Sequence, residues 1–359
     1  MKKELKKIHA IINPVSGVGS KDKIPEMIAS CCLEKGISMH IEYTEYAGHA
    51  GELTLKALDS NADCVIAAGG DGTVNEIARN LLNTDVMLGI IPKGSGNGLA
   101  RDLNIPMDTK SAVDVIFSGH TTMIDACKAN ERLFFCTCGV GFDAAVSKEF
   151  AKEKHRGSLT YVKDIVENYL NYKPEIYELN INNQTIREKA FLIACANASQ
   201  YGNNAFIAPN ADINDGKIDI TILSPFNALD IGPLALQLFT KTIDKNSKIK
   251  TIRATEAQIV RQKAGVMHID GEPVMEPEEI NISVINSAIH VFTPASISFV
   301  EDMQRRFNEV FRFFEDRLTG LSELTGFTGK NLSSTPDIAG FASVRLFPEQ
   351  GGPFFPEDF

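Results

Sequence analysis

The sequence has no apolar run long enough to cross a membrane and no zinc-binding pattern. No run approaches the roughly 18 consecutive apolar residues of a spanning helix. The basic start is followed by an apolar stretch that Asn13 and Pro14 interrupt, which is too short for a secretory signal. The seven cysteines form no C-x-x-C pair and lie in apolar surroundings. We therefore expect reduced core cysteines and a cytoplasmic protein.

The sequence also lacks the excess of positive charge that is common in nucleic-acid-binding proteins. Its 36 lysines and arginines are outnumbered by 46 aspartates and glutamates, which gives a net charge of -10. A nucleic-acid partner is therefore not expected. Two local basic segments, Lys148–Arg156 and Lys241–Lys263, are compatible with a solvated surface or with a patch that contacts a membrane.

No internal repeat is present, and the first third of the chain alternates between short apolar strands and helices of about ten residues. The strands are expected near residues 7–14, 38–45, 63–70 and 86–92, with helices at 23–35, 50–58 and 73–82. This alternation predicts a parallel sheet with helices on both faces. A ligand should then bind at the carboxyl ends of the strands.

The pattern changes near Thr121 to strands with hairpin-like turns, interrupted by one helical segment at Gly157–Tyr172. We predict an α/β ATP-binding domain at residues 1–125 and a mainly antiparallel β domain at 126–297, whose last strand returns to the first domain or stays in the second. An amphipathic helix is expected at 298–322, where it packs on the body or faces a partner or membrane. Residues 323–359 have the composition of a disordered tail.

Three glycine-rich stretches follow the predicted parallel strands. The stretch Gly69–Thr73 leaves a strand and enters a helix, a place where backbone N–H groups can bind phosphate. Asp71 would repel phosphate unless a magnesium ion bridged the two. By itself this stretch also fits a tight turn with a helix-capping aspartate. Pro92–Arg101 and Asn13–Gly17 are equivalent stretches at neighbouring strand ends, so one bound nucleotide explains all three better.

Two other nucleotide-binding patterns fit less well. Gly17–Lys23 lacks the Gly-Lys-Ser/Thr order of a P-loop, and the stretch around Asp71 lacks the third glycine of a dinucleotide fingerprint.

The ordered motifs resemble those of the diacylglycerol kinase catalytic family, which includes bacterial lipid kinases and the sphingosine and ceramide kinases. The resemblance rests on Gly-Gly-Asp-Gly-Thr with Asn75 and Glu76, on the Pro92–Arg101 stretch, and on further matches at 139–146, 208–220 and 268–273. It covers roughly residues 5–297. NAD kinases and phosphofructokinases share a distant Gly-Gly-Asp-Gly element, and the resemblance implies their type of nucleotide domain. Asn75 and Glu76 favour the lipid branch.

The resemblance implies an ATP-dependent transfer of the γ-phosphate to a lipid hydroxyl, on diacylglycerol or a sphingoid base. Asp71 would hold the catalytic Mg²⁺ region, and Asp270 and Glu272 would face it, with Glu272 as the proton acceptor. Without the resemblance, Asp270–Glu272 would be an exposed hairpin turn. The residues implied to line ATP are Asn13, Pro14, Val15, Ser16, Gly17, Thr44, Gly69, Gly70, Asp71, Gly72, Thr73, Asn75, Glu76, Gly94, Ser95 and Asn97.

Some bacterial members also have a structural magnesium site, and the matching stretch here includes Asp212, Asp215 and Lys217. Asp215 would provide a carboxylate, whereas Asp212 and Lys217 would offer backbone carbonyls, because a charged lysine side chain cannot bind a cation. An Asp-Gly turn without metal is the alternative. Many bacterial members have Gly-Thr-x-Asn-Asp where this chain has residues 94–98, a form closer to the sphingosine-type kinases, so the lipid substrate stays open.

We expect the partners to be ATP, Mg²⁺ and a lipid substrate at the inner membrane surface, in a peripheral cytoplasmic enzyme of lipid metabolism and phospholipid biosynthesis. A homodimer is compatible with this pattern. The alternatives are NAD kinase-like phosphorylation of a soluble nucleotide and a nucleotide sensor without catalysis. The presence of Asp71, Asp270 and Glu272 together argues against the sensor.

Overall fold

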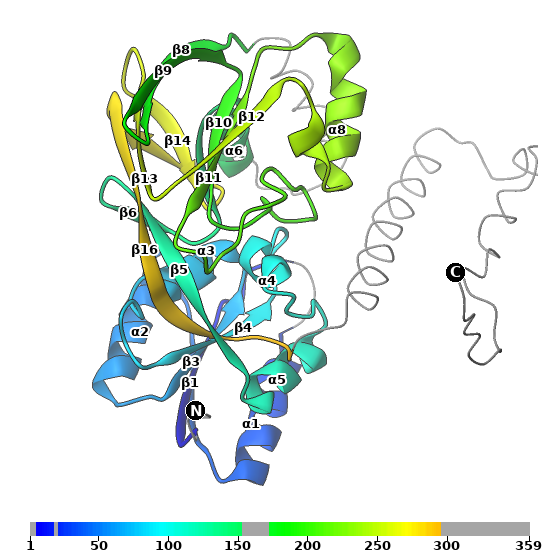
Figure 1. The fold of residues 1–359 in the computed structure, drawn as a ribbon. Coiled ribbons are helices and arrows are strands. Elements are labelled where there is room, and N and C mark those ends of the chain that lie inside the picture. Colours follow the sequence, from blue (N-terminus) through cyan, green and yellow to red (C-terminus); the bar gives the residue numbers. More distant parts are fainter. Residues whose placement is uncertain (1–4, 18–20, 153–171, 296–359) are drawn as a thin grey trace, which may run out of the picture. The chain divides into compact units, whose positions relative to one another are not determined.

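The computed structural model describes residues 5–17, 21–152 and 172–295 (Figure 1). The predicted helix at residues 298–322 and the tail at 323–359 lie outside the described residues, as does nearly all of the helix predicted at Gly157–Tyr172. The described residues contain two sheets that belong to one compact unit. None of the described helices is long and apolar enough to cross a membrane.

The N-terminal part is a parallel sheet, as predicted. Strands β1 (Lys7–Ile12), β2 (Ser38–Tyr43), β3 (Cys64–Gly69) and β4 (Met87–Pro92) lie in the order β2-β1-β3-β4, and each neighbouring pair is parallel. Every residue of β3 and β4 is buried. Such uniformly apolar strands need cover on both faces, because neither face is polar enough to meet water.

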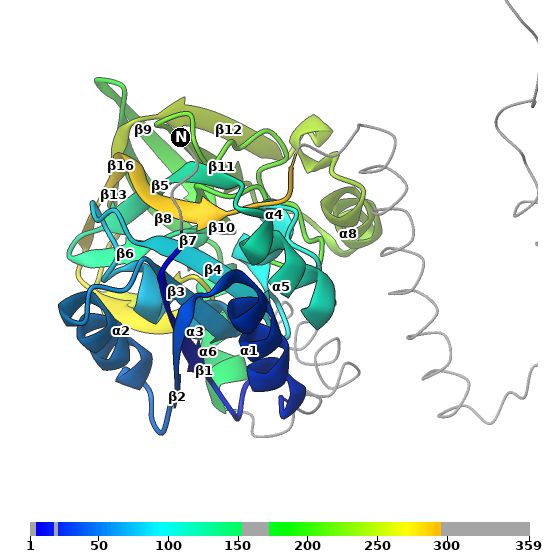
Figure 2. The same ribbon diagram turned by 90° about the horizontal axis from the view of Figure 1, so that it is seen from below.

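Helices cover both faces of this sheet (Figures 1 and 2). On one face, α1 (Lys23–Lys35) and α5 (Thr109–Ser118) pack against Ile8, Ile12 and Ile66. On the other face, α2 (His49–Asp59) and α3 (Asp71–Ala78) pack against side chains of opposite parity along the same strands. The short helix α4 (Gly98–Asp102) follows the loop after β4. Because the four strands are parallel, their carboxyl ends lie along the same edge of the sheet.

The C-terminal part is mainly antiparallel β structure, as predicted, and its two sheets form a sandwich. One sheet contains β7 (Thr137–Gly141), β10 (Leu192–Ala196), β11 (Ile218–Leu223), β12 (Ile249–Ala254), β14 (Gly265–Ile269) and β15 (Glu272–Glu276), in the order β12-β11-β10-β7-β14-β15. Opposite it lie β5 (Thr121–Ala129), β6 (Arg132–Phe134), β8 (Glu175–Ile181), β9 (Gln184–Ala190), β13 (Glu256–Val260) and β16 (Glu279–Phe292). Their facing side chains form one apolar core. Helices α6 (Phe142–Lys152) and α8 (Ile231–Phe239) complete this part, with two short 3-10 helices, η1 (Ala228–Asp230) and η2 (Ile243–Lys245).

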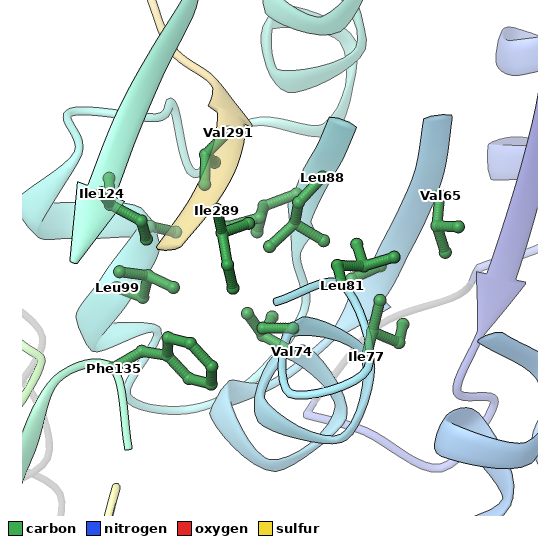
Figure 3. Close-up of a cluster of buried hydrophobic side chains, with 14 of the residues drawn as sticks. Val65, Val74, Ile77, Leu81, Leu88, Leu99, Ile124, Phe135, Ile289 and Val291 are labelled. Carbon is green, nitrogen blue, oxygen red and sulfur yellow. The ribbon is translucent and has the colours of Figure 1, made fainter. Parts of the chain in front are cut away.

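Strand β16 connects the two parts. Its amino-terminal half pairs with β13 and β5 in antiparallel fashion, and its carboxyl end lies between β5, again antiparallel, and β4, with which His290 and Val291 pair in parallel. Ile289 and Val291 of β16 pack with Val74 and Leu88 in one buried cluster, which Figure 3 shows. The parallel sheet and one layer of the sandwich are therefore a single continuous sheet.

A bulge in β16 is held by a buried carboxylate that the sequence analysis did not single out. The register of β16 on β5 shifts between Ile285 and Ile289, and Ser287 has a φ of 52°. Asp125 of β5 is 0% exposed, and its two oxygens accept hydrogen bonds of 2.7 Å from the backbone N–H groups of Ser287 and Gly216. Asp125 thus fixes both the bulge and the neighbouring loop.

Replacing Asp125 with Ala should lower the free energy of unfolding by about 3 kcal/mol, because two buried backbone N–H groups lose their acceptor. Urea unfolding monitored by circular dichroism measures this change. Asp59→Ala, at an exposed aspartate of α2, is the control and should stay within about 0.5 kcal/mol of the wild type. Equal effects of the two substitutions would contradict this role of Asp125.

Candidate active site

The glycine-rich loops meet at the carboxyl edge of the parallel sheet. Gly17 has a φ of +56°, and a Cβ there would lie 1.9 Å from the carbonyl oxygen of Lys93. A Cβ on Gly70 would lie 3.0 Å from the Cα of Gly94. The loops after β1, β3 and β4 are therefore in direct backbone contact, and larger residues at these positions would separate them.

Asparagine side chains hold these loops in shape. Asn13 Nδ2 donates a hydrogen bond of 2.9 Å to Thr73 Oγ1, which links the loop after β1 to α3. Asn97 adopts a left-handed backbone conformation, and its side chain both accepts from Gly94 N–H and donates to Gly94 C=O, at 2.8 Å each. Thr44 is buried and its N–H bonds Ile12 C=O, so it lies beside the same edge.

The remaining predicted ATP residues differ in exposure. Pro14, Val15 and Ser95 are exposed, Val15 by 86%, whereas Ser16 is partly buried and its hydroxyl donates to Asn13 C=O. The exposed residues form the outer rim of the loops, where a ligand can reach them.

Asp71 is the first residue of α3, and its carboxylate faces the start of α4. The backbone N–H groups of Asn97, Gly98 and Leu99 bond it, which lowers its pKa. Loss of water around the group and the neighbouring Asp270 carboxylate outweigh these bonds and raise the pKa of Asp71 to about 6. A carboxyl group with a raised pKa beside a second carboxyl group is typical of functional sites.

Asp270 connects the sandwich to α3. Its carboxylate accepts hydrogen bonds from Asn75 Nδ2 at 2.8 Å and from the backbone N–H groups of Phe135, Cys136 and Thr137 at 2.8–3.1 Å. Burial raises the pKa of Asp270, and these bonds counteract the rise. Through these bonds Asp270 fixes the turn before β15 to α3 and to the segment after β6. Its negative charge also acts on Asp71.

Glu272 reaches the same place from β15. A Cβ on Gly72 would lie 2.6 Å from Glu272 Oε1, so the carboxyl group lies directly over the first turn of α3. Although the residue as a whole is exposed, the pKa of Glu272 is raised, first by partial loss of hydration and then by Glu76 and Asp270, while Arg79 opposes the rise. A raised pKa suits a group that must accept a proton near neutral pH.

Asn75 and Glu76 have structural partners that the sequence analysis did not anticipate. Asn75 Nδ2 also donates to Leu133 C=O at 3.1 Å, so this side chain joins α3 to the sandwich. Glu76 accepts hydrogen bonds from Gly48 N–H and Ala50 N–H, at 2.7 and 3.1 Å, and its charge lies at the N-terminus of α2. These two residues orient α3 between its neighbours, in addition to any contact with ATP.

The stretch expected to hold a structural magnesium ion forms a turn. Asp215 Oδ1 accepts from Lys217 N–H at 2.9 Å, and Asp212 Oδ1 from Asn214 N–H at 3.4 Å. Arg253 Nη1 lies 3.6 Å from Asp215 Oδ2. A guanidinium already neutralises part of the negative charge here, so this turn favours a cation less than Asp71 does.

Among the described residues, one group of three side chains has metal-binding spacing, and it lies elsewhere. His9, His40 and Glu42 are on β1 and β2. Within this group His9 Nε2 bonds Glu42 Oε2 directly at 2.6 Å, and His9 Nδ1 is buried without a partner. A metal ion on Nε2 would leave a buried N–H unpaired at Nδ1, so the arrangement favours the hydrogen-bonded pair.

Several polar groups around the site were missed by sequence reasoning. Asp102 of α4 accepts from Ser199 N–H and Oγ, and Asn197 Nδ2 donates to the carbonyls of Asp125 and Phe135. Asp143 Oδ2 lies 3.1 Å from His268 Nε2 and 3.2 Å from Tyr201 Oη. Their partners are distant in sequence, so the only available signal was a polar residue inside an apolar stretch.

Comparison with known families agrees with this arrangement. Residues 7–129 match the diacylglycerol kinase catalytic domain, and residues 136–293 match the YegS C-terminal NAD kinase beta sandwich-like domain. A crystal structure of a diacylglycerol kinase from Bacillus anthracis covers 82% of this chain and 98% of its own, with a TM-score of 0.65 at 21% identity, which supports the fold.

Curated relatives extend the comparison to most of the chain. A diacylglycerol kinase of Mycobacterium tuberculosis is 27% identical over 300 residues, which is 81% of this chain and 96% of the relative. The protein named probable lipid kinase YegS-like of Pectobacterium atrosepticum is 32% identical over 274 residues, 74% of this chain and 90% of the relative. With both domain types matched in order and the acidic residues of both brought to one edge of the sheet, the chain belongs to the diacylglycerol kinase-like family of lipid kinases.

Proposed function

We propose that this protein transfers the γ-phosphate of ATP to a hydroxyl group of a lipid, either diacylglycerol or a sphingoid base. The observation that carries the proposal is the position of Glu272 from the sandwich over Gly72 of the nucleotide domain, beside Asp71. A carboxyl group from one part thus faces the phosphate-binding loops of the other. This is the arrangement that transfer from a nucleotide to an alcohol requires.

In the proposed reaction, the lipid hydroxyl oxygen attacks the γ-phosphorus, and the bond from this phosphorus to the β,γ-bridging oxygen breaks. Glu272 accepts the hydroxyl proton, and ADP leaves with the bonding electron pair. Backbone N–H groups of the loops at 13–17, 69–72 and 94–97 that make no hydrogen bond within the protein would contact the phosphates. Asp270 positions the Glu272 turn relative to α3 through its bond to Asn75.

The chemistry of Asp71 fits a magnesium ion bound with ATP. The pKa of Asp71 is raised to about 6, first by burial and then by the neighbouring Asp270 carboxylate, although three backbone N–H groups oppose the rise. When bound, Mg²⁺ would neutralise this carboxylate and the phosphate oxygens. The turn at Asp212, Asp215 and Lys217 remains the proposed structural magnesium site, with Arg253 as a competitor for Asp215.

Incubation of the protein with γ-labelled ATP and Mg²⁺ tests the reaction directly. The acceptors are micelles of diacylglycerol, sphingosine, ceramide or phosphatidylglycerol, with NAD as the soluble alternative. We expect label in diacylglycerol or sphingosine and none in NAD. Transfer to NAD without transfer to any lipid would refute the proposal, and no transfer to any acceptor would support a sensor.

Asp71→Asn should lower lipid phosphorylation at least about 100-fold, as expected when an electrostatic group at a transferring phosphate is removed. It should not lower stability in the absence of Mg²⁺. The raised pKa means that the wild type loses stability relative to Asp71→Asn as the pH rises from about 4 to about 6, because the unfolded chain ionises first. Thermal unfolding across this pH range measures the difference.

Asp59→Asn, at an exposed position, is the matched control and should change neither activity nor the pH dependence of unfolding. An Asp71→Asn variant that keeps full activity would show that the site is assigned wrongly.

Glu272→Gln should lower kcat/KM by about 10²- to 10⁴-fold, the usual contribution of a general base. In the wild type, kcat/KM should rise with pH through the raised pKa of Glu272, because only the ionised form accepts a proton. The variant should lose this acid limb and retain a slow rate that does not depend on this pKa. Glu278→Gln, at an exposed glutamate after the same hairpin, should keep the wild-type profile.

A further inference from the structure

An apolar surface on the sandwich is exposed at η1 and α8. The exposed fractions are 88% for Leu229, 60% for Leu236 and 37% for Ile231. The segment from Ile231 to Thr240 contains no charged residue. Leucines this exposed on an uncharged helix are unusual at a surface that meets water, so we expect this surface to contact an apolar partner.

The charges near α8 identify the kind of surface that it fits. Four lysines follow the helix (Lys241, Lys245, Lys248 and Lys250), against Asp230 and Asp244 in the same region and Glu188 of β9, which pairs with Lys250 at 3.1 Å. Lys245 is exposed, and Lys241 lies with its Nζ 5.3 Å from the centre of the Phe206 ring. The chain as a whole has a net charge of -10, so this local excess of positive charge is opposite in sign to the rest of the protein. Exposed leucines followed by lysines match an anionic lipid surface.

The buried side of α8 is continuous with the neighbourhood of the active site. Leu234 and Leu238 pack in one apolar cluster with Phe191 and Tyr201, on the outer side of β10 and β11, where Figures 1 and 2 show α8. A Cβ on Gly98 would lie 3.3 Å from the carbonyl oxygen of Tyr201, and Gly98 N–H bonds Asp71. The cluster thus extends from α8 through Tyr201 to the start of α4.

We propose that η1 and α8 (residues 228–239) form a membrane-docking surface, on which Leu229 and Leu236 insert into an anionic lipid layer while the following lysines contact its headgroups. When the protein is docked in this way, the apolar cluster under α8 faces the lipid layer that contains the acceptor. The role of docking in catalysis rests on the proposed function, but docking itself requires neither ATP nor turnover.

Co-sedimentation of the full chain with vesicles tests the proposal. The vesicles are phosphatidylcholine alone or with about 30% phosphatidylglycerol, a content that gives a negative surface potential. The double variant Leu229→Asp/Leu236→Asp should bind the anionic vesicles at least tenfold more weakly than the wild type, because burial of two leucines is lost. Leu33→Asp, at a leucine of α1 that is 85% exposed, is the matched control and should bind as the wild type does.

The charge contribution is measured with Lys245→Glu/Lys248→Glu, which should weaken binding to the anionic vesicles and leave binding to phosphatidylcholine alone unchanged. Unchanged vesicle binding of the double leucine variant, with its folding confirmed by circular dichroism, would overturn the proposal. It would also be overturned if that variant only converted a dimer into a monomer in light scattering, since a second copy would then be the occupant. Vesicle binding that depends on Leu229 and Leu236, in a protein that phosphorylates no lipid, would support docking while refuting the proposed reaction.

Discussion

The hydrogen bonds of the Asp270 carboxylate determine how the two halves of the site meet. The two oxygens of this carboxylate accept hydrogen bonds from the side chain of Asn75 in α3 and from three successive backbone N–H groups after β6. A buried donor that loses its acceptor costs about 1–3 kcal/mol, so four such bonds strongly define the position of the turn that contains Asp270. Glu272, two residues further on, is consequently held over α3, and its distance from Asp71 depends on this connection rather than on its own contacts.

The same connection brings three carboxyl groups with raised pKa values to one edge of the sheet. Burial raises the pKa of Asp71, Asp270 and Glu272, and the Asp270 carboxylate adds to the rise at Asp71 and at Glu272, where Arg79 opposes it. Like charges in a partly dehydrated site destabilise a fold unless a ligand compensates them. Such a cost is common at functional sites, and it is the basis of the proposal that a magnesium ion binds here with ATP.

The glycines of the site have a packing role as well as the phosphate-binding role inferred from sequence. Gly17 and Gly70 allow backbones of neighbouring loops to approach within contact distance, and Gly72 leaves room for the Glu272 carboxyl group. A tight turn with a capping aspartate would not need these partners. The tertiary contacts thus explain why glycine occurs at several strand ends at once.

Local patterns in the sequence were sufficient for the parallel sheet, the mainly antiparallel second part and the strand-end position of Asp71, because apolar periodicity and glycine placement act over a few residues. Asp270 and Glu272 were assigned only through the resemblance to a known family. The local patterns could not show that Asn75 and Glu76 bond Asp270 and α2, since those partners lie up to 195 residues away. Nor could they assign Asp125 to a bulge in β16 or expose the leucines of η1 and α8. The sequence by itself determined which chemical groups are present and in what order. Only the tertiary structure decided which carboxylates meet, which are neutralised by backbone N–H groups, and which stay without a cation, because these depend on contacts between distant segments.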